Sequence, residues 1–373
     1  MPGHRDNCSF GPVRIQKTLL DGWNAIYHQN WNEKRVFDRV RKNYFWCFGR
    51  LLFEKGLMMN DEISLLSKLK RKVGSWEPFI NFSIKITKNK LRILTYHGIS
   101  PLGVDPIEFE KQLKYISSHF ECYWVSEIPK LLTNKKSKKP SLIITFDDGF
   151  KNHFIKAMPL LEKYNIKATF YIPIDLAENQ SFLWNHEIRC LLMMIEEGDL
   201  PKEIGIIKDK QKKYFEIGRY IESLKKLNIN ERSSIQNDLR KKLKNANFSD
   251  WMMNEYQLMT VEDVRKVSDL IEIGSHTLTH PILTTISDEL LVKEIQESRY
   301  KLEKITGKQI LSFCYPNGIY SDKVLNVVEK NYPVAVSTRE GFVYSSDNLM
   351  TLKRIPAGKN MEDFLLRLIR PTA

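Results

Sequence analysis

The alternation of short apolar runs with amphipathic stretches after residue 90 most constrains what this chain can fold into. Seven runs of β-forming residues fall at 92–96, 141–146, 167–172, 270–275, 310–314, 333–337 and 351–355. Helical patterns lie between them, for example at 108–119, 152–164, 288–305 and 322–330. Strands that alternate with helices of this length predict an α/β fold with a parallel sheet, either open or closed into a barrel.

Two adjacent carboxylates end the second of these runs. Residues 141–150 read SLIITFDDGF, so the apolar run stops at Asp147 and Asp148. The C-terminal edge of parallel strands is where α/β proteins bind ligands. Neighbouring carboxylates repel each other, so a fold that keeps both at one strand end usually places a cation or a proton between them. Alternatively, one Asp caps the following helix and the other is solvated.

A second group of ligand-type side chains follows the run at 270–275, where residues 271–281 read IEIGSHTLTHP. His276 and His280 have the spacing that brings two imidazoles onto one face of a helical turn, as zinc sites often do. Because a residue before proline avoids helical backbone, we expect His280 in a turn at the strand end. Two imidazoles and one carboxylate leave coordination positions open, which is typical of catalytic zinc. One Asp could bind the ion while the other takes a proton from the attacking water.

Two regions flank or interrupt the alternating pattern. Residues 1–90 mix basic and aromatic clusters and predict a basic helical extension ahead of a main domain at 91–373. The extension could pack on that domain or contact an anionic membrane, whereas nucleic acid is not expected because no groove-reading motif accompanies the charge. The interval at about 177–256 is longer than a crossover helix requires and predicts a helical insertion. Near its start, Trp184 is a candidate substrate contact, and His186 could line a cleft or be structural.

Composition limits the class of protein. Hydrophobic content of 42% and charged content of 28% are ordinary for a globular protein. The net charge of +13 suits an anionic membrane, nucleic acid or simple solubility, and does not choose among them. Five widely spaced cysteines predict no disulfide framework. The polar first residues lack a signal peptide, and no span reaches transmembrane length. We therefore expect a cytoplasmic protein, with contact at the inner face of the membrane left open.

The two motifs together, TFDDG at 145–149 and HTLTHP at 276–281, closely resemble the polysaccharide deacetylase family, carbohydrate esterase family four. The resemblance runs from about residue 91 to about residue 358. It implies a distorted (β/α)7 barrel that removes acetyl groups from N-acetylated sugars with the help of a divalent ion. By this resemblance, Asp147 is the catalytic base, and Asp148, His276 and His280 bind one ion, for which zinc is expected.

The third motif departs from the family pattern. Many members have an Arg and a Pro-Tyr pair where residues 313–318 read FCYPNG. The missing Arg normally orients the base, so Arg354 either supplies that contact or is a structural surface residue. The backbone N–H near Asn317, which follows Pro316, could donate to the oxyanion. Tyr315 is a second candidate substrate contact.

The general acid also has to be found elsewhere in this chain. In the family it is usually a histidine in a leucine-rich context near the C-terminus, and no histidine follows His280. His97, at the end of LTYHG in residues 94–98, resembles the acid of the rearranged bacterial exopolysaccharide deacetylases, where it comes from the N-terminal strand. The alternative is a histidine packed under a loop. His153 is expected on the next helix, facing away.

These observations predict a metal-dependent hydrolase that deacetylates N-acetylhexosamine units of a glycan or glycolipid. One alternative is a catalytically impaired carbohydrate-binding protein on the same fold, which the altered third motif favours. A free Asp beside a ligating one argues against that alternative, because a pure binding protein has no need of it. A further alternative is a hydrolase of another amide or of an O-acetyl ester.

Overall fold

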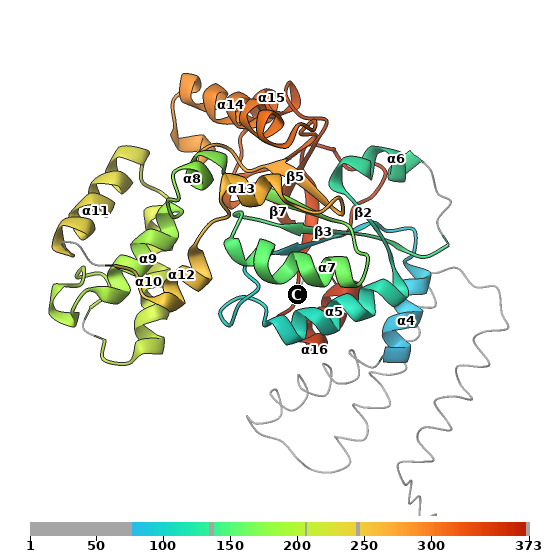
Figure 1. Cartoon of the computed structure of the whole chain (residues 1–373), viewed down its shortest axis with the longest axis horizontal. Helices are drawn as coiled ribbons and strands as arrows, with labels where there is room; N and C mark the ends of the chain where they lie inside the picture. Colours follow the sequence, from blue (N-terminus) through green and yellow to red (C-terminus); the bar gives the residue numbers. More distant parts are fainter. Residues whose placement is uncertain (1–76, 134–137, 206, 244–246, 371–373) are drawn as a thin grey trace, which may run out of the picture. The chain divides into compact units, whose positions relative to one another are not determined.

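The computed structural model of the chain describes residues 77–133, 138–205, 207–243 and 247–370 (Figure 1). Its first described helix is α4 (Glu77–Ile86). Most of the expected N-terminal extension, at 1–90, lies outside the described residues, so membrane contact through it stays a prediction. Within the part of the chain that is described, no helix combines the length and the apolar content needed to cross a bilayer.

Within the described residues, seven parallel strands close into a barrel, which confirms the distorted (β/α)7 fold. The barrel strands are β1 (Arg92–Tyr96), β3 (Ser141–Phe146), β4 (Ala168–Ile172), β5 (Ile271–Ser275), β6 (Ser312–Cys314), β7 (Val334–Glu340) and β8 (Leu352–Pro356). The sheet closes because β1 pairs with β8 on one side and with β3 on the other. Each barrel strand corresponds to one predicted run.

One short strand, β2 (Glu121–Tyr123), was not predicted. It pairs with the first half of β3, through residues 141–143, while β4 pairs with the second half at Thr145 and Phe146. The two strands thus share one side of β3. A three-residue strand is too short for hydrophobic alternation to reveal it.

The register of β1 and β3 sets the level of the site. Arg92 lies opposite Leu142 and Tyr96 lies opposite Phe146, with no shift between them. The backbone N–H of Asp147 continues the ladder by donating to the carbonyl of Tyr96 at 3.0 Å. The residues that follow the two strands therefore emerge side by side at the C-terminal edge.

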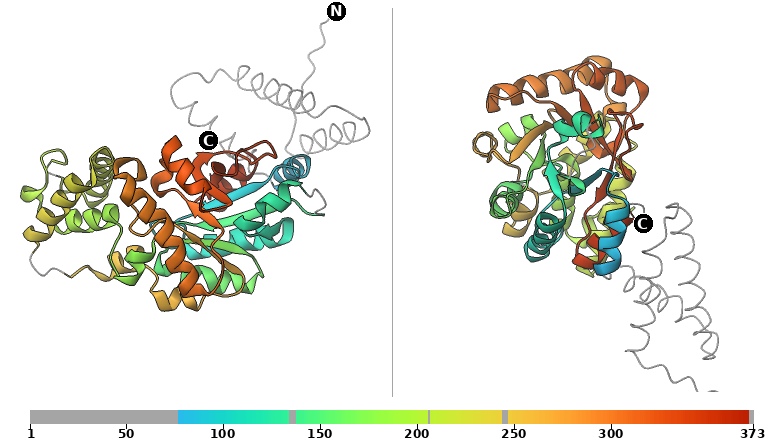
Figure 2. Two further views of the ribbon diagram at one scale, coloured as in Figure 1. Left: turned by 90° about the horizontal axis from the view of Figure 1, so that it is seen from above. Right: turned by 90° about the vertical axis from the view of Figure 1, so that its right-hand side faces the viewer.

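Helices surround the barrel, as two further views show (Figure 2). They include α5 (Pro106–His119), α7 (Met158–Lys163), α8 (Ile174–Glu178), α13 (Val261–Arg265), α14 (Asp288–Thr306), α15 (Asp322–Glu329) and α16 (Met361–Ile369). Tyr96, Phe109 and Phe146 form an aromatic cluster between the barrel and α5, with ring centroids 5.2 to 5.9 Å apart. Each fully buried ring of this kind contributes about 1.5–3 kcal/mol relative to exposure, so the cluster anchors β1 and β3 where the site begins.

The interval at 177–256 is helical, with no strand among its described residues. It contains α9 (Trp184–Met194), α10 (Lys210–Leu224), α11 (Ile229–Lys242) and α12 (Asp250–Tyr256), whose colours in Figure 1 run from green at α9 to orange-gold at α12. Ile188, Ile217 and Leu239 belong to an apolar cluster of its own. Glu187 of α9 pairs with Arg240 of α11 at 2.5 Å, which ties these helices together. Whether the insertion is a separate subdomain stays a prediction.

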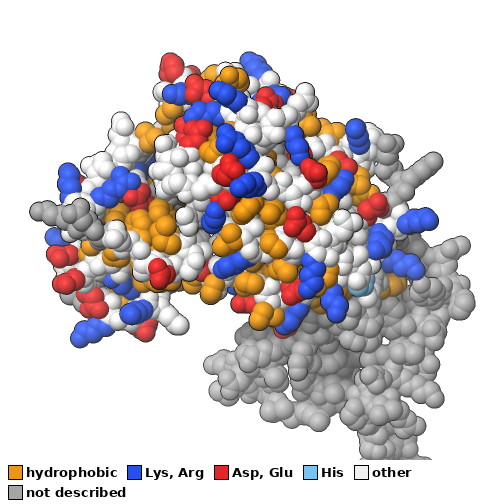
Figure 3. Space-filling model, in the orientation of Figure 1, with side chains coloured by type: hydrophobic (Ala, Val, Ile, Leu, Met, Phe, Trp, Pro, Cys, Tyr) orange, Lys and Arg blue, Asp and Glu red, His pale blue; other side chains and the backbone are white. Residues whose placement is uncertain are grey.

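On the described face shown in Figure 3, Lys and Arg side chains are interspersed with Asp and Glu. The excess positive charge of the chain is therefore not gathered into one basic area on this face. A broad single-sign surface is the electrostatic footprint of nucleic-acid binding. This face does not favour that function.

Candidate active site

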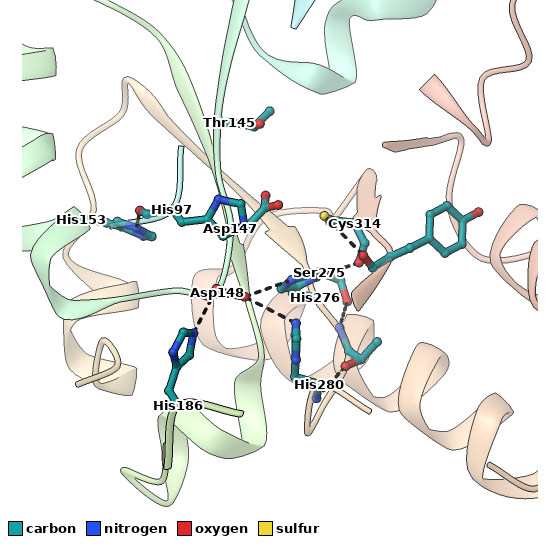
Figure 4. A network of polar contacts seen from close by, with 12 residues as sticks. His97, Thr145, Asp147, Asp148, His153, His186, Ser275, His276, His280 and Cys314 are labelled. Carbon is teal, nitrogen blue, oxygen red and sulfur yellow. Dashed lines mark hydrogen bonds and ion pairs between the residues drawn. The ribbon is translucent and has the colours of Figure 1, made fainter. Parts of the chain in front are cut away.

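Side chains from four barrel strands meet at the C-terminal edge of the barrel. Figure 4 labels Asp147, Asp148, His276 and Cys314 among them. Asp147 and Asp148 follow β3, His276 follows β5, Cys314 ends β6 and Arg354 lies on β8. All five are buried. Parallel strands present their carboxyl ends at one edge, so residues up to 207 positions apart in the chain become neighbours here.

Asp148, His276 and His280 form a group that could hold a metal ion. Their ligand atoms all lie within 4.8 Å of one another and are buried. The Nε2 atoms of His276 and His280 are 3.5 and 3.4 Å from Oδ1 of Asp148. Nδ1 of His276 lies 2.7 Å from the backbone carbonyl of Cys314. That bond places the hydrogen on Nδ1 and leaves Nε2 free for an ion, as in known histidine metal sites. Two imidazoles and a carboxylate therefore fit a divalent cation.

The backbone around this group is strained. Four residues have φ values in the left-handed region that L-residues seldom adopt: Asp148 at 73°, Thr277 at 71°, His280 at 57° and Asn317 at 56°. Such conformations cost of order 1–3 kcal/mol each and persist where surrounding contacts impose them. His280 lies in a turn rather than in a helix, as its position before proline predicted.

Glu294, on α14, holds the turn that carries His280. Its carboxylate accepts hydrogen bonds from the backbone N–H groups of Leu278 and Thr279 at 2.8 and 3.0 Å, and from Oγ1 of Thr279 at 2.5 Å. Burial raises the pKa of Glu294, against the lowering effect of these bonds. Sequence reasoning missed this residue, because a single Glu in an amphipathic helix carries no local signal of being buried.

Asp147 is paired with Arg354 rather than with the histidine group. Nη1 and Nη2 of Arg354 each donate to one oxygen of Asp147 at 2.6 Å, and Nε donates to the carbonyl of Ser337 at 2.9 Å. Arg354 is 1% exposed, so it is not a surface residue. Burial acts to raise the pKa of Asp147, but Arg354, with smaller effects from His97 and His276, lowers it to about 2. Asp147 is therefore an oriented, ionised carboxylate.

His97 lies at the exposed side of the site. It follows β1, and its side chain extends toward Asp147 (Figure 4). His153 does not face away as predicted. It is buried, and its Nε2 contacts the backbone carbonyl of His97. The helix after β3 begins with a π-helical turn, η2 (His153–Ala157), which changes the side chains that face inward. Burial lowers the pKa of His153 to about 4.

The two candidate substrate contacts lie in different surroundings. Tyr315 is 1% exposed and its hydroxyl donates to the carbonyl of Met350 at 3.0 Å, so its side chain is not available to a substrate. This corrects the prediction, because the residue points into the barrel wall. Trp184 packs against the apolar cluster of the insertion, with Arg232 5.1 Å above its ring.

The FCYPNG segment forms a tight turn, η5 (Pro316–Gly318), directly after β6. Pro316 is buried at the start of that turn. Asn317 occupies its left-handed position, and Nδ2 of Asn317 is buried without a hydrogen-bond partner among the described residues. The N–H groups of Gly318 and Ile319 donate to the carbonyls of Tyr315 and Pro316. The main-chain N–H of Asn317 is thus the donor of this turn that could bind a ligand.

His186 is the residue that sequence reasoning could not decide. It comes from α9 of the insertion, and its Nε2 lies 3.9 Å from Oδ2 of Asp148. Burial lowers the pKa of His186, against the opposing effect of Asp148. For Asp148, burial acts in the raising direction, but His186, His276 and His280 together bring its pKa well below its ordinary value.

The sequence profile described as "Polysaccharide deacetylase" matches residues 134–332, and the chain belongs to the polysaccharide deacetylase family. It is a hydrolase of that type, with a polysaccharide as its class of substrate. A relative in Bacillus subtilis (strain 168), "Putative polysaccharide deacetylase YxkH", is 23% identical over 73% of this chain and 73% of its own length.

A solved structure shares the fold. The Streptococcus pyogenes deacetylase PplD, solved in complex with acetate, is 21% identical, with a TM-score of 0.51 over 75% of this chain and 98% of that chain. A polysaccharide deacetylase from Bacillus cereus is 20% identical, with a TM-score of 0.49 over 75% of this chain and 69% of that chain.

Proposed function

We propose that this chain is a divalent-metal-dependent deacetylase that hydrolyses the acetamide of N-acetylhexosamine units in a glycan or glycolipid, with zinc as its ion. The observation that supports this proposal most is the separation of the two aspartates. Asp148 faces two imidazoles, whereas Asp147 is held by Arg354. One carboxylate can therefore bind an ion while its neighbour remains free to accept a proton.

A zinc ion at Asp148, His276 and His280 would supply a Lewis acid that polarises the substrate carbonyl and makes water more acidic. Asp147 accepts the proton of the attacking water. Its two hydrogen bonds to Arg354 fix the direction of the carboxylate, and its low pKa keeps it ionised at neutral pH. The main-chain N–H of Asn317 donates to the oxygen on which negative charge develops.

His97 donates a proton to the departing amine. Its exposed position lets it reach a bound substrate, and its backbone carbonyl is held by the buried His153. A neutral amine is a far better leaving group than an amide anion, so an amide substrate requires this acid. An activated ester does not.

The altered third motif no longer favours a protein that only binds carbohydrate. Cys314 lies next to Arg354, whose Nη2 is 3.4 Å from its Sγ, and the guanidinium reaches Asp147 from β8. The base thus keeps an arginine partner although residues 313–318 contain none. A binding protein would not require a buried, bidentate ion pair directed at a carboxylate beside a metal group.

The test is to load the protein with Zn²⁺ and to measure acetate release from N-acetylated oligosaccharides, N-acetylated glycolipids and O-acetylated sugars. We expect release from at least one N-acetylated substrate and its loss in Asp147→Asn. Acetate release from O-acetylated sugars alone would show that the substrate is an ester and not an amide. No release from any of them by metal-loaded protein would contradict the proposal.

A further inference from the structure

We infer that His186 is a positioning residue of the metal site: its imidazole holds Oδ2 of Asp148 and so makes helix α9 of the insertion part of that site. This inference rests on the proposed role of Asp148 as a metal ligand. It concerns a residue that lies outside both family motifs in the sequence, at 145–149 and 276–281. Figure 4 shows His186 approaching Asp148 from the side opposite to His276 and His280.

The two oxygens of Asp148 have separate partners. Oδ1 faces Nε2 of His276 and of His280 at 3.5 and 3.4 Å, whereas Oδ2 faces Nε2 of His186 at 3.9 Å. A carboxylate that is engaged on one oxygen only can still rotate about its side-chain bonds. Engagement of the second oxygen fixes the plane of the carboxylate, and such outer contacts to metal ligands sustain metal affinity.

The ring of His186 is held in place independently of Asp148. It stacks on Tyr256 of α12, with centroids 4.4 Å apart and planes 20° apart, and it meets Phe150 edge-on at 5.4 Å. The hydroxyl of Tyr256 is in turn hydrogen-bonded to that of Tyr214 on α10 at 2.9 Å. The contacts that hold the imidazole itself are thus the rings of Tyr256 and Phe150, and the hydroxyl bond only joins α12 to α10. A ring fixed in this way costs little additional side-chain entropy when it contacts Asp148.

The polar atoms of His186 define its tautomer. Nδ1 is buried and has no hydrogen-bond partner among the described residues. A carboxylate oxygen only accepts hydrogen bonds, so the ring hydrogen belongs on Nε2, where it faces Oδ2 of Asp148. A distance of 3.9 Å exceeds a direct hydrogen bond, and a small ring movement or one bridging water completes the contact.

The test compares Zn²⁺ affinity, measured by competition with a chromophoric chelator, for metal-free full-length wild type and three variants. His186→Phe keeps an aromatic ring for the stack on Tyr256 but removes the N–H donor. His186→Gln places an amide N–H near the position of Nε2 without the ring. Tyr256→Phe is the matched control, because it keeps the stacking surface and removes only the hydroxyl that bonds Tyr214. Thermal unfolding of the metal-free forms reports on folding separately.

We expect His186→Phe to bind Zn²⁺ about 10- to 100-fold more weakly, the usual effect of removing an outer partner of a metal ligand. His186→Gln and the control should stay close to wild type. Wild-type affinity in His186→Phe would overturn the inference, as would equally weak binding by the Phe and Gln variants. If the Phe variant does not fold, the same comparison between His186→Leu and His186→Gln decides. If wild type itself binds no Zn²⁺, the proposed metal site is wrong and the role of His186 falls with it. If wild type binds Zn²⁺ and His186→Phe binds it equally well, only the role of His186 is wrong.

Discussion

Replacing Arg354 with Met tests how far the site depends on one buried ion pair. Met fills similar volume without charge, and it leaves Asp147 buried without its guanidinium partner. The pKa of Asp147 is lowered from 3.8 to about 2, which corresponds to about 2.5 kcal/mol of stability at neutral pH. The carbonyl of Ser337 also loses a donor. Breaking a buried pair on one side typically costs about 3–5 kcal/mol, so Arg354→Met should be destabilised by that amount at pH 7.

The stability loss of Arg354→Met should also depend on pH. In wild type the folded pKa of Asp147 lies below the unfolded value, so its contribution is complete above about pH 4 and is lost as the pH falls toward 2. In Arg354→Met, burial remains without its counterion and raises the pKa of Asp147. As the pH falls from 7 toward 4, Asp147 is therefore protonated in the folded variant before it is protonated in the unfolded chain. The loss of stability relative to wild type should shrink over this range.

Urea unfolding in the presence of a chelator, from pH 4 to pH 7, measures this deficit. The double variant Asp147→Asn/Arg354→Met is the control, because it contains no unpaired charge and should recover much of the stability at pH 7. The reasoning is refuted if Arg354→Met is as stable as wild type at pH 7. It is also refuted if the deficit stays constant with pH, since packing loss alone would then explain it.

Three further predictions concern the roles of the site residues. Purified wild type should carry a divalent ion, and His276→Ala and His280→Ala should each lose it, as measured by elemental analysis; unchanged metal content in both would remove this group from the mechanism. Asp147→Asn should keep the ion but lose about 10²- to 10⁴-fold in turnover, whereas Asp148→Asn should first weaken metal affinity, and the opposite pattern would exchange their roles. His97→Ala should keep the ion and lose most activity on amides but little on activated aryl acetates; full activity on an amide would place the acid elsewhere.

The parts of this molecule that could be predicted from sequence are those that local patterns encode. Each barrel strand appears as a short apolar run, and the run at 310–314 shortens only to Ser312–Cys314. Asp148, His276 and His280 could be grouped because each follows a strand, and parallel strands end at one edge. Pro281 was enough to place His280 in a turn.

The contacts that could not be predicted join elements without a shared pattern. Arg354 meets Asp147 across 207 residues, and the sequence offered it only as one of two possibilities. Glu294 and His186 lie on helices, and nothing in their surroundings marks a polar residue that will face the site. His153 faces inward because one turn is π-helical, and a 3.6-residue periodicity cannot anticipate that turn. Tyr315 looked available to substrate because sequence does not reveal on which side of the barrel wall a ring lies.

If an ion occupies the proposed site, the left-handed backbone at Asp148, Thr277 and His280 links its binding to local opening of the protein. These conformations are unfavourable in themselves, and in the metal-free chain only contacts such as those of Glu294 oppose their release. An ion bound to Asp148 and His280 would stabilise only the closed arrangement, because the open one does not hold the two ligands together. Protection against hydrogen exchange and proteolysis should therefore depend most on metal supply in the loop after β3, which carries Asp148, and in the loop after β5, which carries His280. The barrel strands beneath these loops should keep their protection.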